Sequence, residues 1–165
     1  MLSPGHALFF SLLLTPTAAA QSLTFDIDRP VRTIAAEGGF VLSGAGAPAT
    51  VGALGSDAIA DRVLELRGAS LPPGQAVLPI TSMMESFVPM AGGSAGNLCL
   101  GGASGRFPIG FVDGAGGFEL GVDITALPAG QGTVSAMAGQ NWFFQLWFRD
   151  GSSSNFSEAA KVTFR

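Results

Sequence analysis

This chain of 165 residues contains no tyrosine, and histidine, cysteine and lysine each occur once, as His6, Cys99 and Lys161. With a single cysteine, no intramolecular disulfide can form. His6 lies in a segment that we expect to be removed, which excludes from the mature chain any histidine-dependent catalytic triad or dyad and any zinc or iron site built on imidazole. A Ser-Lys dyad would have to use Lys161, near the end of the last expected strand. We therefore expect a protein that is not an enzyme and needs no cofactor.

Positive charge is also scarce, because eight Lys and Arg residues stand against twelve Asp and Glu residues, for a formal net charge of −4. Proteins that bind nucleic acids cluster Lys and Arg on one surface. No such cluster occurs here, so we expect no nucleic-acid partner. An extracellular polysaccharide or a matrix protein remains as the expected partner class.

The first twenty residues carry no Asp, Glu, Lys or Arg. An apolar run, ALFFSLLL at residues 7–14, precedes Pro16 and three alanines that end at Ala20, which is typical of a signal peptide with a small-residue cleavage site. The positive segment that usually opens such a peptide is missing, so a buried strand or helix of the mature fold is the alternative. We expect residues 1–20 to be a cleaved signal peptide, the protein to be secreted or at the cell surface, and no transmembrane segment to remain.

The rest of the chain, residues 21–165, is expected to form one domain. It is rich in glycine and proline yet strongly apolar, and apolar runs of about 5–8 residues alternate with turn-forming clusters. About eleven short strands at this spacing predict an all-β fold, an antiparallel β-sandwich with Ig-like architecture; a small β-barrel is the alternative. The expected strands include residues 23–28, 40–42, 107–112, 118–124, 133–137, 141–149 and 161–164. We expect residues 107–112 and 118–124 to form a hairpin, because Asp113 and three glycines lie between them.

The expected strand at residues 141–149 is the most informative, because side chains alternate between the two faces of a strand. One face is uniformly apolar and should point into the core: Trp142, Phe144, Leu146 and Phe148. The other face mixes aromatic and polar groups and is the candidate binding surface: Phe143, Gln145, Trp147 and Arg149. In the alternative interpretation a second layer covers this face, and Arg149 pairs with Asp150 or Glu158.

A calcium site is a weaker hypothesis, since oxygen ligands suffice for this ion. The segment DGSSSN at residues 150–155 has alternating oxygen side chains, and the candidate ligands are Asp150, Ser152, Ser154 and Glu158. The alternative is a hairpin loop in which Asp150 and Asn155 bond the backbone.

Sulfur-containing residues complete the candidates. We interpret Cys99, between Leu98 and Leu100, as a small buried apolar residue; an intermolecular disulfide or a reactive thiol is the alternative. Met83, Met84 and Met90 bracket Phe87, and we expect this group to fill the core rather than to form an adaptable binding surface.

Five segments of the last hundred residues together form one recognisable pattern. They are NLCLGG at 97–102, GRF at 105–107, DITALP at 123–128, WFFQLWFRD at 142–150 and SNFS at 154–157. The pattern resembles a β-rich module found, usually at the C-terminus, in exported proteins of environmental bacteria. Ile124 stands where the module has leucine, and Phe148 where it has tyrosine. The resemblance implies an exported β-rich domain, often appended to larger proteins, and it implies no particular activity.

These observations favour a secreted, non-catalytic module for binding or adhesion to an extracellular glycan or matrix. One alternative is a structural subunit of the envelope or matrix that assembles through strand edges. Another is a glycoside hydrolase that uses two carboxyl groups, which requires no histidine.

Overall fold

The structure is a computed structural model that describes residues 32–34 and 46–165. The expected signal peptide at residues 1–20 and the strands expected at residues 23–28 and 40–42 lie outside the described residues. The described part is all-β and consists of several antiparallel sheets, which confirms the predicted β-sandwich. None of its helices has the length and apolarity that crossing a membrane requires.

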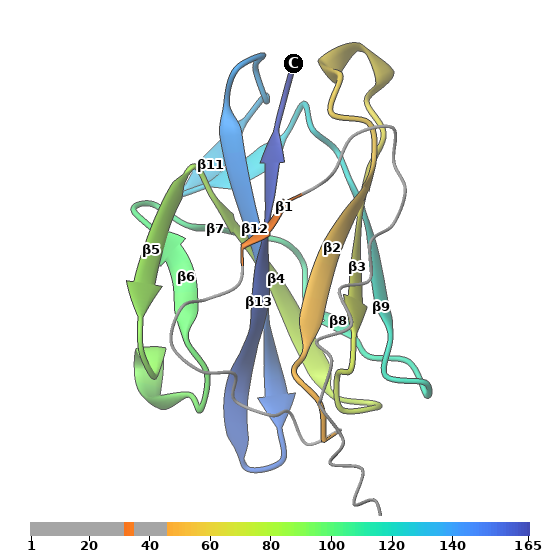
Figure 1. Cartoon of the computed structure of the whole chain (residues 1–165), viewed down its shortest axis with the longest axis vertical. Helices are drawn as coiled ribbons and strands as arrows, with labels where there is room; N and C mark the ends of the chain where they lie inside the picture. The colour runs from red at the N-terminus through yellow and green to blue at the C-terminus, as the bar shows by residue number, and fades with distance from the viewer. Residues whose placement is uncertain (1–31, 35–45) are drawn as a thin grey trace, which may run out of the picture.

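The largest sheet has six strands in the order β1-β13-β12-β4-β7, with β8 also paired to β4 (Figure 1). Its strands are β1 (Arg32–Ile34), β4 (Ala76–Ser82), β7 (Gly105–Arg106), β8 (Gly110–Phe111), β12 (Asn141–Asp150) and β13 (Ser153–Thr163). The central strand β12 lies between β4 and β13 and is antiparallel to both. The backbone of β12 is therefore hydrogen-bonded on both sides, and this fixes the positions of its side chains.

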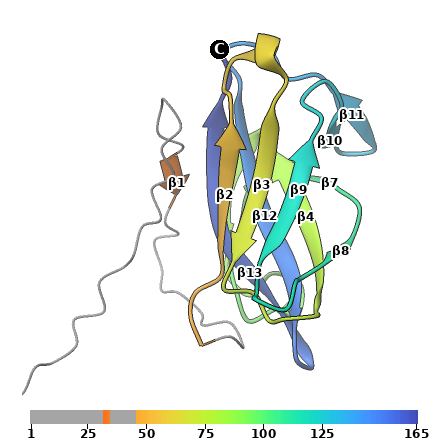
Figure 2. The same ribbon diagram turned by 90° about the vertical axis from the view of Figure 1, so that its right-hand side faces the viewer.

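A three-stranded sheet faces the six-stranded one and closes the sandwich (Figure 2). It is formed by β2 (Thr50–Gly55), β3 (Leu64–Ala69) and β9 (Phe118–Val122), in that order. The main core lies between these two sheets and includes Leu66 and Leu71 opposite Phe144 and Phe148. In the described residues no strand of one sheet pairs with a strand of the other. The sheets therefore do not close into a barrel, and the barrel alternative is wrong.

A third layer covers part of the six-stranded sheet on the side away from the core (Figure 1). It is the hairpin of β5 (Met84–Val88) and β6 (Leu98–Gly101), with the short helix η2 (Ala91–Gly93) in the connection. Leu100 of this hairpin packs against Ile80 and Phe143 of the six-stranded sheet in a second, smaller core. A further hairpin, of β10 (Leu127–Ala129) and β11 (Gly132–Val134), lies at one end of the sandwich.

The hairpin of β12 and β13 differs from the sequence expectation in length. The sequence predicts a strand only from residue 161, whereas β13 begins at Ser153. The buried polar residues of β13 are hydrogen-bonded: Leu146 N–H donates to Ser157 Oγ at 2.9 Å. Polar side chains that satisfy buried backbone groups are compatible with a central strand, and local polarity does not reveal this.

The hairpin predicted between residues 107–112 and 118–124 is wrong. The turn is present, since Asp113 N–H donates to the carbonyl of Gly117 at 2.8 Å and the Asp113 carboxylate accepts the Ala115 and Gly117 amides. However, β8 pairs with β4 in one sheet and β9 pairs with β3 in the other. Turn chemistry closes the loop, but it does not decide which sheet each flanking strand joins. Pro108, which lacks an N–H, also reduces the expected first strand to two residues.

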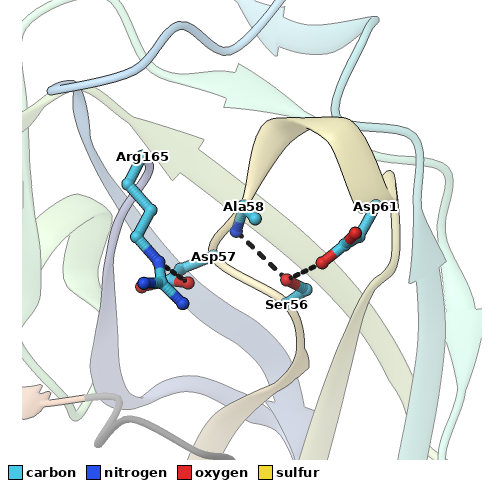
Figure 3. A network of polar contacts seen from close by, with 5 residues as sticks. All are labelled: Ser56, Asp57, Ala58, Asp61 and Arg165. Carbon is cyan, nitrogen blue, oxygen red and sulfur yellow. Dashed lines mark hydrogen bonds and ion pairs between the residues drawn. The ribbon is translucent and has the colours of Figure 1, made fainter.

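The end of β13 is attached to the connection between β2 and β3 (Figure 3). Arg165 donates from Nε to the Asp57 carboxylate at 2.6 Å, and its N–H donates to the Asp57 carbonyl at 2.9 Å. The Ile59 N–H in turn donates to the Arg165 carbonyl at 3.0 Å, just at the start of helix η1 (Ile59–Asp61). These bonds join the two sheets of the sandwich at one end.

Candidate functional site

The predicted core face of β12 is confirmed. The four side chains on this face are fully buried against the three-stranded sheet: Trp142, Phe144, Leu146 and Phe148. Burying an apolar side chain of this size stabilises a fold by roughly 1.5–3 kcal/mol. This face therefore holds the sandwich together and positions the opposite face of the same strand.

The opposite face of β12, which we call the outer face, is divided by the β5–β6 hairpin. Phe143 is buried beneath the hairpin, where it packs with Leu100, and the Lys161 ammonium lies 5.6 Å from its ring centroid. The alternative interpretation, in which a second layer covers this face, is therefore correct for the half of the face that contains Phe143. Phe143 is thus part of the second core rather than of an open surface.

Gln145, the next residue on the outer face, is fully buried and joins three parts of the chain. Its Nε2 donates to the carbonyls of Asn97 at 2.9 Å and Ser157 at 2.8 Å. Its Oε1 accepts the Cys99 N–H at 2.9 Å. Every polar atom of the side chain is used, so Gln145 attaches the hairpin to the sheet and has no donor left for a ligand.

Trp147 and Arg149 are the more accessible residues of the outer face. Trp147 is half-buried, and Leu78 on β4 and Phe156 on β13 lie directly opposite it on the neighbouring strands. Arg149 is exposed, and its Cζ lies 5.6 Å from the centroid of the Trp147 ring, a cation–π geometry. We call these four residues the Trp147 surface. The structure thus brings together two of the four predicted binding residues at an accessible position.

The four candidate calcium ligands are not brought together. Asp150 and Ser153 are paired at the end of the β12–β13 hairpin, and the Asp150 carboxylate accepts Asn155 Nδ2 at 3.4 Å. Glu158 lies five residues beyond Ser153 along β13, which at the rise of an extended strand is a distance of about 16 Å. This segment is the turn of the β12–β13 hairpin, in agreement with the alternative interpretation as a hairpin loop. Across residues 46–165, no group of three or more His, Cys, Asp or Glu side chains is arranged to hold a metal ion.

Cys99 is buried beside Gln145, as predicted. Burial raises the pKa of its thiol, and the nearby carboxylates of Glu85 and Glu158 act in the same direction, against the opposing hydrogen bond with Gln145. A thiol with a raised pKa carries little of the reactive thiolate at neutral pH. Cys99 is a packing residue of the third layer.

The expectation that the methionines around Phe87 fill the core is wrong. Five large apolar side chains of this segment are between 41% and 66% exposed: Met83, Met84, Phe87, Val88 and Met90. We call them the β5 patch. The hairpin is supported from its other strand, because Leu98 and Leu100 of β6 supply its contacts with the sheet. A run that looks like core in the sequence therefore lies on the surface. The sequence does not indicate this exposure, because only Glu85 is charged between residues 83 and 105, and so little charge is typical of a buried segment.

No family model, no curated protein and no solved structure matches this chain. The resemblance to a module of exported bacterial proteins therefore stays a prediction.

Proposed function

We propose that this chain is an exported, non-catalytic module that binds an extracellular polysaccharide through the Trp147 surface. The observation that supports this most directly is the half-buried Trp147 ring, held on a strand that is paired on both sides, with the Arg149 guanidinium against it. A site built on a paired strand is pre-organised, so little conformational entropy is lost on binding.

The chemistry of the Trp147 surface suits a sugar ring. The indole is large, rigid and amphipathic, and the apolar C–H face of a pyranose can pack on it. Arg149 carries five donors in a planar fork and suits hydroxyl or carboxylate oxygens of the same polymer. Leu78, Trp147 and Phe156 form a row across three strands, which suits an extended polymer better than an isolated small molecule.

A panel of neutral and acidic polysaccharides, probed by affinity electrophoresis or microarray, tests the proposal. We expect Trp147→Ala to weaken binding at least about tenfold, which corresponds to the loss of one stacking contact. Arg149→Gln should selectively weaken binding to acidic polymers, because it removes the charge and keeps the length. The control is Val63→Ala, which removes an exposed apolar side chain next to β3, in the sheet on the other side of the sandwich.

Two outcomes would overturn the proposal. The wild-type protein could bind no polymer of the panel at high micromolar concentration, or Trp147→Ala could bind as well as the wild type. Release of reducing ends from any polymer would instead favour the glycoside hydrolase alternative.

A further inference from the structure

The outer face of the six-stranded sheet also includes Phe111, on the edge strand β8 (Figure 2). Phe111 pairs with Ala76 of β4, and directly paired residues carry their side chains on the same face of a sheet. Val77, the next residue of β4, is buried in the main core, so Ala76 lies on the outer face. Phe111 therefore shares this face with Trp147 and Arg149, and it is 72% exposed.

The backbone fixes the position of Phe111 relative to Trp147. Beside the pair of Phe111 and Ala76, the Val112 N–H donates to the Gln75 carbonyl at 3.0 Å. Strand β12 lies on the other side of β4, so two strand spacings and two residues separate Trp147 from Phe111, a Cα distance of roughly 12 Å. A single sugar ring cannot reach across this distance, whereas successive rings of a polymer can.

Two exposed guanidinium groups accompany the two aromatic rings. Arg106 on β7 pairs with Ile80, whose side chain belongs to the second core on the outer face, so Arg106 lies on that face as well. Arg106 and Arg149 are both exposed, and neither forms a salt bridge with a residue that the structure describes. A third cation of this face, Lys161, is half-buried against Phe143.

The carboxylates around this part of the face have other partners. The strands β4, β7 and β8 contain no Asp or Glu. Asp113, in the turn after β8, accepts two amides of that turn, and Asp150, at the end of β12, accepts a side-chain amide of β13. Glu85 and Glu158 lie near the Cys99 thiol, in the region of the hairpin. The two exposed guanidinium groups can therefore bind an anionic group, although the chain as a whole is acidic.

We propose that the ligand of the Trp147 surface is an acidic polysaccharide built from uronic acids, and that its binding site extends to Phe111 and Arg106. This inference rests on the proposed polysaccharide binding and names the class of polymer. From the strand registers, the two exposed guanidinium groups lie on opposite sides of the line that joins Trp147 and Phe111. Sugar rings stacked on these two aromatic side chains thus present their carboxylates to a guanidinium on either side. A guanidinium fits a planar carboxylate with two parallel N–H bonds.

Affinity electrophoresis with polygalacturonate and with its fully methyl-esterified form tests this inference, because esterification keeps the sugar rings and removes the charge. We expect the protein to bind the acid form at least about tenfold more tightly, the value of one charge-assisted hydrogen bond, and to lose this preference at high salt. Phe111→Ala should weaken binding to both forms about three- to tenfold, whereas Phe111→Trp keeps a stacking surface and should bind like the wild type. Arg106→Gln should weaken binding to the acid form alone.

The matched controls lie in the three-stranded sheet or next to it. Arg67→Gln removes the same charge from β3, and Val63→Ala removes an exposed apolar side chain. Both variants should bind each polymer like the wild type. Urea unfolding of all variants checks that the fold is intact, which we expect because every replaced side chain is exposed.

Equal affinity for polygalacturonate and its methyl ester would overturn the assignment of an acidic polymer, and tighter binding of dextran sulfate would overturn the assignment of uronic acids. Wild-type affinity of Phe111→Ala would overturn the extended site, as would equal effects of Arg106→Gln and Arg67→Gln. Trp147→Ala tests the proposed function separately. If that variant binds the methyl ester more weakly while Phe111→Ala does not, the proposed function stands and the extension to Phe111 fails. Absence of binding to both forms would overturn this inference and leave the proposed function to the other polymers of the panel.

Discussion

Individual side chains on β12 have different roles although they alternate along one strand. Phe143 and Gln145 share a face with Trp147, but the β5–β6 hairpin buries the first two, whereas Trp147 is only half-buried. Gln145 attaches that hairpin to the sheet, since it satisfies the Cys99 amide and the carbonyls of Asn97 and Ser157. A buried polar group without a partner costs about 1–3 kcal/mol, so this glutamine matters more for stability than its polarity suggests.

Gln145→Leu keeps the approximate volume of the side chain but removes all three hydrogen bonds. We expect the free energy of unfolding to fall by about 2–4 kcal/mol, because the Cys99 amide and the carbonyls of Asn97 and Ser157 lose their partner. Urea denaturation measures this loss, and the rate of Cys99 alkylation reports whether the hairpin opens. Gln131→Leu, the same change at an exposed turn residue, is the control and should shift stability by less than about 0.5 kcal/mol. Equal stability of the two variants would contradict the role given to Gln145.

At the scale of elements, the β5–β6 hairpin decides which surfaces the molecule offers. It buries Phe143 and Gln145 on the outer face, leaves Trp147 half-buried and Arg149 exposed, and carries the exposed side chains of the β5 patch. Its connection to β13 is close: the Ala95 N–H donates to the Ser154 carbonyl at 2.8 Å. Gly96 follows immediately, and a Cβ at this position would meet Asn155 Oδ1 and the backbone nitrogen of Phe156 at 2.8 Å. The hairpin can lie on the sheet because residue 96 has no side chain.

Gly96→Ala should therefore loosen the third layer. We expect a loss of about 1–3 kcal/mol in the free energy of unfolding, the usual cost of overpacking, with faster exchange of the Cys99 and Leu100 amides. Gly121→Ala is the matched control, because a Cβ there meets no atom within 4 Å. Hydrogen exchange followed by mass spectrometry separates the two variants. If the hairpin amides exchange equally slowly in both, the close approach at Gly96 does not hold the layer.

At the scale of the whole molecule, three layers stabilise one another without a disulfide. The six-stranded sheet is central, with the main core on one side and the smaller core under the hairpin on the other. Cys99 takes part only as a buried side chain. Such a fold does not need an oxidising compartment, so the proposal of export rests on residues 1–20 and on the resemblance to a module of exported proteins, and not on the fold.

Export is tested by producing residues 1–165 in a bacterium with a general secretion pathway. We expect the protein outside the cytoplasm, with Gln21 as its first residue by intact-mass measurement. Replacing both Ala18 and Ala20 with Leu should block cleavage, because signal peptidase requires small residues there. A cytoplasmic product that still begins at Met1 would contradict the signal-peptide prediction and, with it, the extracellular setting of the proposed function.

The sequence by itself determined the fold class and the two faces of the longest strand. Alternation is a local property: a strand places Trp142 and Phe144 on one side whatever its neighbours are, and uniform apolarity identified that side as core. The burial of Cys99 could be predicted for a similar reason, since leucines flank it on both sides.

Only the tertiary structure decided which polar and apolar residues are accessible. The sequence suggests that Gln145 is open and that Met84 and Phe87 are buried, whereas the structure shows the reverse, because the hairpin covers the former and exposes the latter. The turn residues between β8 and β9 likewise did not indicate that the two strands join different sheets. Burial depends on contacts between segments far apart in the chain, such as that of Cys99 with Gln145, and local patterns contain no record of those pairings.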